Sequence, residues 1–198
     1  GQGDSILVVS PDGYVMLVDS GTEGQAQTVM DYMATAGISS IDYTVASHMD
    51  ADHIGGLDLI LQAYPEIVAA FDHGGSYGTN EYSEYAAATG SRRQTLVTDD
   101  MVELGGGMAV EAIHAHAGSQ IENDNSVVLR LTYGTNTVLL GGDCQSACEA
   151  TYDPGPIQVY KVHHHGSGTS SGEQLLNQMD PYSALISCGA GNSYGHPH

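Results

Sequence analysis

Apolar and polar positions divide the chain into short strands and amphipathic helices. Two strand-like runs, 6–10 and 14–19, flank Pro11-Asp12-Gly13, which is a strong turn signal, so a hairpin is predicted. Apolar residues at helical spacing over 25–36 end at Gly37 and predict a helix. Further strands are expected over 41–47, 67–71, 94–98, 108–115, 127–133, 137–140, 158–162 and 184–187, and further helices over 57–63, 80–89 and 173–179.

The order of these elements indicates a mixed fold. Strand pairs come first, and strands then alternate with helices, which by itself predicts only an α/β or α+β protein. A chain of 198 residues suits one domain with a substantial core. No run of eighteen apolar residues is present, so no membrane segment is expected within this sequence. The sequence lacks an initiator Met and a signal-peptide pattern, so we expect a processed or excised piece.

The most informative segment is the run from Ser47 to Gly56, Ser-His-Met-Asp-Ala-Asp-His-Ile-Gly-Gly. Two imidazoles and two carboxylates fall within six residues, directly after the apolar run 41–46. A strand that ends there would place these side chains at its carboxyl edge, where open α/β sheets often carry their sites. Nitrogen and oxygen donors at this spacing are typical of a zinc or manganese site. A polar loop that only caps a helix at Asp52 is the plainer alternative.

This run resembles the first metal motif of the metallo-β-lactamase fold, His-x-His-x-Asp-His, with Asp50 in place of the second His. Together with other segments, it resembles the metallo-β-lactamase-like domain of DNA-uptake competence proteins. These segments, in order, are Gly1-Gln2-Gly3-Asp4-Ser5, Leu17-Val18-Asp19-Ser20-Gly21, Asn123-Asp124-Asn125-Ser126, Leu140-Gly141-Gly142-Asp143, Lys161-Val162-His163-His164-His165-Gly166-Ser167 and residues 189–198. The resemblance implies an α+β fold, an αββα sandwich of two mixed sheets packed face to face with helices outside. It covers nearly the whole chain, although the family continues with a further helix after the position of His198.

The resemblance also implies a site with two divalent metal ions, Mn²⁺ or Zn²⁺. His48 and Asp50 would bind the first metal, Asp52 and His53 the second, and Asp143 would bridge them. Either His164 or His165 would complete the second metal, and His164 is favoured. Asp124 either reaches the first metal or only caps a turn. Asp52, Asp143 and His165 are the expected catalytic residues.

A nuclease that acts on DNA, or another phosphodiesterase, is the activity that this resemblance implies. Many oxygen donors and few imidazoles shift the metal preference towards manganese. One alternative is another hydrolase on the same metal centre, such as a phosphorylcholine-type esterase or a lactamase, and Asp50 argues against a lactamase. The other is a non-catalytic metal-binding module. The oligomeric state stays open.

Charge complicates the nuclease interpretation. The chain has 24 acidic and 4 basic residues, so its formal net charge is −20. Such a surface repels nucleic acid and anionic lipid. High salt screens this repulsion, so a salt-loving source is expected, although bound metals could instead offset part of the charge. Arg92 and Arg93 either contact phosphate or form an ordinary surface pair.

The remaining candidates are cysteines and histidines. Cys144 and Cys148 are four residues apart and could form a disulfide if a helix begins there, which would indicate an oxidising, extracytoplasmic location. Cys188 is expected to be a buried apolar residue. His163 is expected to be a surface imidazole. Structural or exposed roles are expected for His114 and His116, whereas His196 and His198 either lie beside the metals or only pack a loop.

The charge of −20 predicts that salt stabilises the fold. Because added NaCl screens repulsion between carboxylates, the melting temperature should rise steeply between dilute buffer and molar NaCl. Differential scanning calorimetry across this range measures the effect. A melting temperature that stays flat or falls would contradict a fold adapted to salt.

Overall fold

A computed structural model of the chain describes residues 3–198 and contains two mixed β-sheets. The first sheet has five strands in the order β1-β2-β3-β4-β5, in which β1 is antiparallel to β2 and the other neighbours are parallel. Its strands are β1 (Ile6–Val9), β2 (Val15–Val18), β3 (Tyr43–Val45), β4 (Ala69–Asp72) and β5 (Arg93–Thr95).

The second sheet has six strands in the order β11-β10-β9-β8-β7-β6. The strands from β6 to β9 form an antiparallel series, and β10 and β11 extend it in parallel with β9. Its strands are β6 (Met101–Glu103), β7 (Met108–His114), β8 (Val128–Tyr133), β9 (Asn136–Leu140), β10 (Val159–Lys161) and β11 (Ser183–Leu185).

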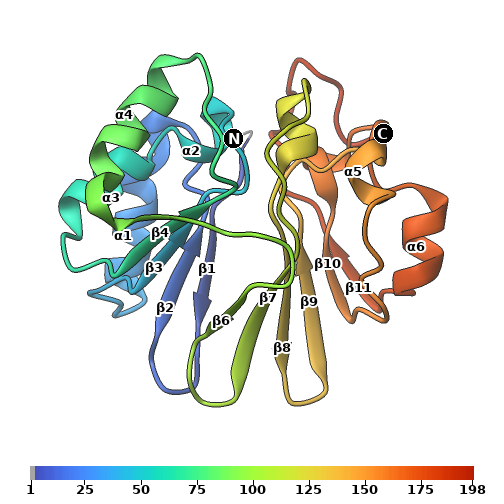
Figure 1. Ribbon diagram of the computed structural model, residues 1–198, viewed down its shortest axis with the longest axis horizontal. Coiled ribbons are helices and arrows are strands. Elements are labelled where there is room, and N and C mark those ends of the chain that lie inside the picture. Colours follow the sequence, from blue (N-terminus) through green and yellow to red (C-terminus); the bar gives the residue numbers. More distant parts are fainter. Residues whose placement is uncertain (1–2) are drawn as a thin grey trace.

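Helices cover the outer faces of both sheets, so the molecule is an αββα sandwich as predicted (Figure 1). The helices on the first sheet are α1 (Ala26–Thr35), α2 (Ala51–Ile54), α3 (Leu57–Ala63) and α4 (Asn80–Thr89), and those on the second are α5 (Ser146–Glu149) and α6 (Glu173–Met179). Within residues 3–198, every helix is too short or too polar to cross a bilayer.

Strand β2 shows how the sandwich is held together. All four of its residues are buried, because both of its faces meet apolar layers. Leu17 packs with Met33 of α1 and Ile60 of α3, whereas Met16 packs between the sheets with Val110 and Leu129. A third apolar cluster lies under α5 and α6 on the far side of the second sheet. Burial on both faces explains why β2 reads as a continuous apolar run rather than as an alternating one.

Strand direction brings the polar segments of the sequence to one rim. The carboxyl ends of β2, β3 and β4 meet at one edge because these strands are parallel, and the same holds for β9, β10 and β11. Strands β1 and β8 run the opposite way, so their amino ends lie at this rim as well. The segments around Asp4, Asp19, His48, Asp143 and His165 therefore converge.

Most predicted elements are present, with ends that differ by a few residues, and helices 80–89 and 173–179 have the predicted bounds. The pattern missed β6, α2 and α5, which have only three or four residues each and cannot show a full period. Gly1 and Gln2, which open the first quoted motif, lie outside the described residues.

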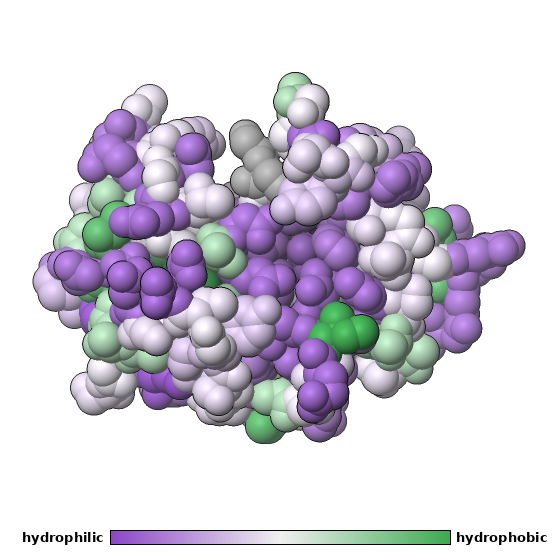
Figure 2. Space-filling view, turned by 90° about the horizontal axis from the view of Figure 1, so that it is seen from above, coloured by the Kyte–Doolittle hydropathy of each residue, from purple (hydrophilic) through white to green (hydrophobic). Residues whose placement is uncertain are grey.

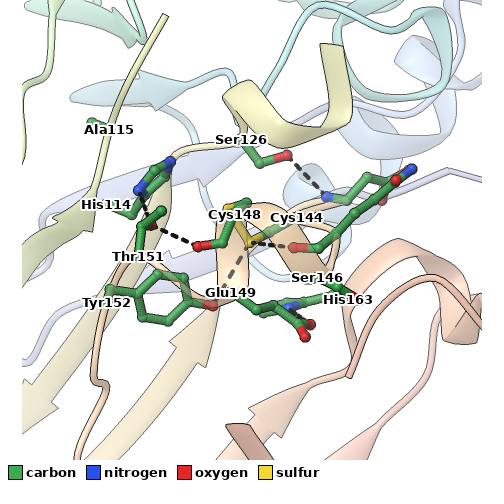
Figure 3. Close-up of a disulfide and its surroundings, with 12 residues drawn as sticks. His114, Ala115, Ser126, Cys144, Ser146, Cys148, Glu149, Thr151, Tyr152 and His163 are labelled. Atoms are coloured by element: carbon green, nitrogen blue, oxygen red, sulfur yellow. Dashed lines mark hydrogen bonds and ion pairs between the residues drawn. A yellow bond between two sulfur atoms is a disulfide. The ribbon is translucent and has the colours of Figure 1, made fainter. Parts of the chain in front are cut away.

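A disulfide joins Cys144 to Cys148, with Cα atoms 5.5 Å apart (Figure 3). It links the residue after Asp143 to α5, which carries Glu149. Tyr152 Oη lies 3.8 Å from Cys144 Sγ, and both cysteines belong to the apolar cluster beneath α5. Cys188 is free and half-buried, so the expectation that it is a buried residue was wrong.

Removal of this disulfide should destabilise the protein. The double variant Cys144→Ser/Cys148→Ser frees a loop of about five residues, for which loop-closure entropy predicts a loss of about 2 kcal/mol in the free energy of unfolding. Urea unfolding of wild type with and without reductant, and of the variant, measures this loss. Cys188→Ser is the matched control and should change stability by less than about 0.5 kcal/mol. Equal stability of the double variant and the control would show that the bond contributes nothing.

Candidate metal centre

The loop after β3 supplies the first group of side chains. Residues 47–49 form a bend, Asp50 is extended, and α2 begins at Ala51, with Asp52 and His53 on its first turn. Gly55 lets this short helix pack tightly, because a Cβ there would collide with the carbonyl of Ala51 and lie 2.7 Å from the backbone nitrogen of Glu23. His48 and His53 are fully buried, and their ring centroids are 4.2 Å apart.

Donor atoms from three loops lie at distances that suit shared metal ions. His53 Nε2 is 3.3 Å from Asp143 Oδ1 and 3.4 Å from His165 Nε2. His165 Nε2 is in turn 3.4 Å from Asp52 Oδ2 and 3.5 Å from Asp143 Oδ2. These separations are long for hydrogen bonds between charged groups. They match the spacing of about 3.4 Å between two ligands that are each about 2.1 Å from a tetrahedral ion.

Four overlapping groups of close donors occur among residues 3–198, and two of them consist entirely of residues predicted from the sequence. One contains His48, His53 and Asp143, and the other contains Asp52, His53 and His165, with all donor atoms of each group within 4.8 Å of one another. Within the described chain, the buried atoms His48 Nε2, Asp143 Oδ1 and Asp4 Oδ1 have no hydrogen-bond partner. Buried polar atoms are normally paired. Ligand atoms that are buried, lie close together and lack a hydrogen-bond partner are suited to bind divalent metal ions. This set of ligand atoms therefore fits the divalent metal ions expected from the sequence.

The outward ring nitrogens of these histidines are held by neighbouring groups. His53 Nδ1 donates to Asp19 Oδ2 at 2.8 Å, and His165 Nδ1 donates to the Ser187 carbonyl at 2.9 Å. Ser47 Oγ donates to Asp19 Oδ2 at 2.7 Å and lies 3.1 Å from His48 Nδ1. Such contacts fix the ring orientation and leave Nε2 free to bind metal.

Backbone strain helps to place the other donors. His164 and His165 both adopt left-handed backbone angles, with φ of 50° and 55°. This conformation is unusual for a residue with a Cβ, and residues that adopt it cluster at turns and functional sites. Gly142 also has a positive φ of 51°, and a Cβ there would lie 2.6 Å from Ser47 Oγ. The end of β9 thereby packs against the loop after β3, and Asp143 follows at once.

Opposite charges dominate the electrostatics of the cluster. Burial alone would lower the pKa of His165, but hydrogen bonds to Asp143 and Asp52 raise it to about 10. Burial likewise opposes the charge on His53, yet Asp143 and Asp19 raise its pKa well above the usual range. Burial would raise the pKa of Asp143, but His53 and His165 hold it well below its usual range. The metal-free site is therefore a set of carboxylates balanced by imidazolium ions.

Three predicted ligands stand outside these two groups. Asp50 Oδ2 lies 3.4 Å from His48 Nε2, and His164 Nε2 lies 3.7 Å from Asp143 Oδ2, so both flank the cluster. The structure places His165 rather than the favoured His164 beside Asp52 and His53. Asp124 is buried, and no group of close donors among residues 3–198 contains it.

Sequence reasoning missed three residues that bear on the site. Asn123, next to Asp124, lines the pocket, and its Nδ2 lies 3.4 Å from His164 Nε2. Asp19 orients His53, and Asp4 lies with Oδ1 3.6 Å from His165 Nδ1. The sequence did indicate both aspartates, because each lies at the end of a strand and within one of the segments that resemble the competence proteins. Whether Asn123 or its neighbour Asp124 faces the pocket depends on the direction in which a 3₁₀ turn points each side chain.

The prediction that His163 lies on the surface was wrong. His163 is fully buried, and its Nδ1 lies 2.9 Å from Glu149 Oε1. Space for the ring exists because Gly141 lacks a side chain, since a Cβ there would collide with His163 Nε2. Burial lowers the pKa of His163 in spite of Glu149. His114 is buried too, whereas His116 is exposed.

The cluster opens into a polar pocket of about 240 Å³. Figure 2 looks onto this rim, where hydrophilic side chains gather in a hollow between the two halves of the molecule. The pocket is lined by Asp50, Asp52, Asn123, Asp143, His164, His165, Tyr194 and His196. Tyr77 stands next to it, and the Asp50 carboxylate raises the pKa of the Tyr77 hydroxyl.

With fold and site described, the chain can be compared with known proteins. The model of the metallo-beta-lactamase superfamily matches residues 1–190, so this protein belongs to that superfamily. Among solved structures, a metallo-beta-lactamase with a HARLDQ motif from Cronobacter sakazakii superposes with a TM-score of 0.59, at 14% identity, over 81% of this chain and 74% of that one. The metallo-beta-lactamase SMB-1 gives a TM-score of 0.55 at 19% identity, over 74% of this chain and 60% of that one. These two likenesses concern the fold alone.

Relatives of higher identity are competence and recombination proteins. The chain is 31% identical to Recombination protein 2 of Haemophilus influenzae, 32% to Competence protein ComA of Neisseria gonorrhoeae and 27% to ComE operon protein 3 of Bacillus subtilis. Each alignment covers 100% of this chain and 24%, 27% and 28% of the relative, respectively. The chain thus spans about a quarter of the length of these relatives, to whose metallo-β-lactamase-like region it is homologous.

Metal binding at this cluster should release protons. Because His53 and His165 carry protons in the metal-free protein and must lose them to bind metal, the affinity should rise with pH, by about tenfold per pH unit for each proton released. Isothermal titration with Mn²⁺ or Zn²⁺, in two buffers of different ionisation enthalpy and at several pH values, counts these protons.

Two variants make the measurement specific to the cluster. His165→Ala should lower the affinity at least tenfold and reduce the number of protons released, whereas His116→Ala, an exposed control, should match wild type. An affinity that does not change with pH, or equal behaviour of both variants, would exclude His165 from the metal site.

Proposed function

We propose that this protein is a dinuclear metal-dependent phosphodiesterase that acts on DNA. The supporting observation is the pair of overlapping donor groups that share His53, with the Asp143 carboxylate close to both His53 and His165. Two ions that share a carboxylate lie about 3.5–4 Å apart, which is the spacing used for in-line displacement at phosphate. A metal that serves only structure needs a closed shell of ligands, whereas this cluster opens into a pocket.

The donors divide naturally between two ions. His48 and Asp50 would hold one ion, Asp52, His53 and His165 the other, and Asp143 would lie between them. Ions bound there would polarise the phosphate and make water a better nucleophile near neutral pH. Carboxylates and imidazoles are equal in number in this set, and its hard oxygen donors suit manganese as well as zinc.

The chain's own residues would position the substrate. Asn123 Nδ2 and His164 Nε2 face the same pocket, 3.4 Å apart, and can bind oxygens of a phosphate. Burial lowers the pKa of His164, so its ring is neutral near pH 7 and can either donate or accept a hydrogen bond. Asp19 keeps the His53 ring in one orientation throughout.

DNA is the proposed substrate because of the relatives. Their names concern competence and recombination, and they align with the whole of this chain. The polar pocket between the two sheets is open to solvent and presents no element that reads bases, so cleavage should show little sequence preference. Single strands should be cut at least as well as duplex, since a flexible backbone reaches a recessed site more easily.

The test is a direct comparison of substrates. Wild type loaded with Mn²⁺ should cleave single-stranded DNA and bis-p-nitrophenyl phosphate, and a chelator should abolish both activities. Asp143→Asn should lower kcat at least a thousandfold, because the carboxylate between the two ions is lost, whereas His116→Ala should match wild type.

Other outcomes identify other functions. Cleavage of a chromogenic lactam or a phosphorylcholine ester without DNA cleavage, over several salt concentrations, would replace the proposal with another hydrolase of this fold. Intact substrates in the presence of two bound metals would indicate a metal-binding module without catalysis.

A further inference from the structure

None of the four cationic side chains of the protein lines the pocket, and three of them are engaged by protein groups elsewhere. Arg92 donates to the carbonyls of Leu61 and Ala88, and Arg93 forms an ion pair with Asp72 at 2.7 Å. Lys161 is buried, with Nζ 2.6 Å from Asp4 Oδ2. Arg130 is half-buried within β8, opposite Glu111 of β7.

This arrangement leaves a nucleic acid without the usual contacts to its backbone. Proteins normally neutralise phosphates with Lys and Arg, and the formal charge of −20 here opposes such binding. The residues that line the pocket are acidic, neutral or histidine. Apart from the phosphate that the metals would hold, a nucleic-acid strand must therefore be bound by uncharged contacts. Stacking of bases on aromatic rings is such a contact, and it is independent of sequence.

An aromatic platform stands at the edge of the pocket. The rings of Tyr194 and His196 are stacked, 12° from parallel, with centroids 5.7 Å apart. His196 meets His164 edge to face at 5.8 Å, and His164 Nε2 lies 3.7 Å from Asp143. Tyr194 is 67% exposed although it lines the pocket, so much of its ring is open to a ligand. Three rings thus lead from solvent to the metal centre.

The loop that carries this platform is held in place by Asn192. Its Oδ1 accepts hydrogen bonds from the backbone nitrogens of Tyr194 and His196, both at 3.1 Å. Its Nδ2 donates to the carbonyls of Gly189 and His196. A ring fixed before binding loses little conformational entropy when a ligand stacks on it.

We propose that Tyr194, backed by His196, is a stacking site for one base of a single-stranded nucleic acid next to the scissile phosphate. This inference rests on the proposed phosphodiesterase function and specifies how its substrate is bound. The base adjacent to the phosphate at Asp143 would lie on the Tyr194 ring and fix the direction of the strand. Such a site favours single strands, because bases in a duplex stack on each other instead.

The test compares Tyr194→Ala, Tyr194→Leu and Tyr194→Phe with Tyr182→Ala. Tyr182 is a matched control, because it is 92% exposed and precedes β11, at the end of the sheet opposite to the pocket. With single-stranded oligothymidylate as substrate, the Ala and Leu variants should raise KM roughly tenfold with little change in kcat. The Phe variant should keep the wild-type KM, since it retains the ring, and Tyr182→Ala should match wild type.

An abasic substrate series separates stacking from a structural role. In this series, each oligonucleotide lacks the base at one position. At a single position, loss of the base should weaken binding to wild type by about the same factor as Tyr194→Ala weakens binding of the complete oligonucleotide. At that position, the variant should lose nothing further, because base and ring contribute one shared interaction. A fluorescence titration with 2-aminopurine at that position, in Ca²⁺ to prevent cleavage, gives a readout apart from activity.

The possible results separate failure of the stacking site from failure of the proposed function. If wild type cleaves bis-p-nitrophenyl phosphate, either of two results would overturn the stacking site. One is an equal KM for wild type and Tyr194→Ala. The other is that the losses of affinity caused by the missing base and by the variant add when the two are combined. Failure of wild type to cleave that small phosphodiester would instead overturn the proposed function, and the stacking inference with it.

Discussion

Carboxylates crowd together at one rim of the sandwich, and the rest of the site depends on how their charge is balanced. Asp4, Asp52 and Asp143 lie around His165, and Asp19 and Asp143 lie around His53. Buried like charges are unstable without a counter-charge. The single lysine balances Asp4, and the imidazoles balance the others only while they are protonated. Divalent metal ions bound at this rim would supply that charge near neutral pH and displace those protons.

Support for Asp143 comes from beneath the rim. Asp143 is followed by Cys144, whose bond to Cys148 ties the loop to α5, and Glu149 of α5 holds the buried His163. His163 directly precedes His164 and His165, so one small helix connects the carboxylate loop with the histidine loop. A change in this helix would move donors on both loops together. The disulfide thus connects the loop of Asp143 to the helix that contacts His163.

Much of the fold and part of the site follow from local sequence. Strand ends such as 46–48 and 140–143 mark the rim because apolar runs stop there and ligand-type residues begin. The choice between His164 and His165 is different, because it depends on two consecutive left-handed backbone residues, which the local sequence pattern does not predict. Asn123 also could not be assigned, since its role arises from a contact with His164, on a loop far apart in sequence. His163 was misplaced because its cavity depends on the glycine at 141, in another strand loop.

The most direct test of the account is electron paramagnetic resonance of the protein titrated with Mn²⁺. Two ions that share donors around Asp143 and His53 interact magnetically, so the spectrum at two equivalents should show a coupled dinuclear signal. This signal should vanish in Asp143→Ala, while His116→Ala keeps it. A spectrum of isolated Mn²⁺ at every ratio, or saturation at one ion per chain in the folded wild type, would contradict a dinuclear centre at this rim.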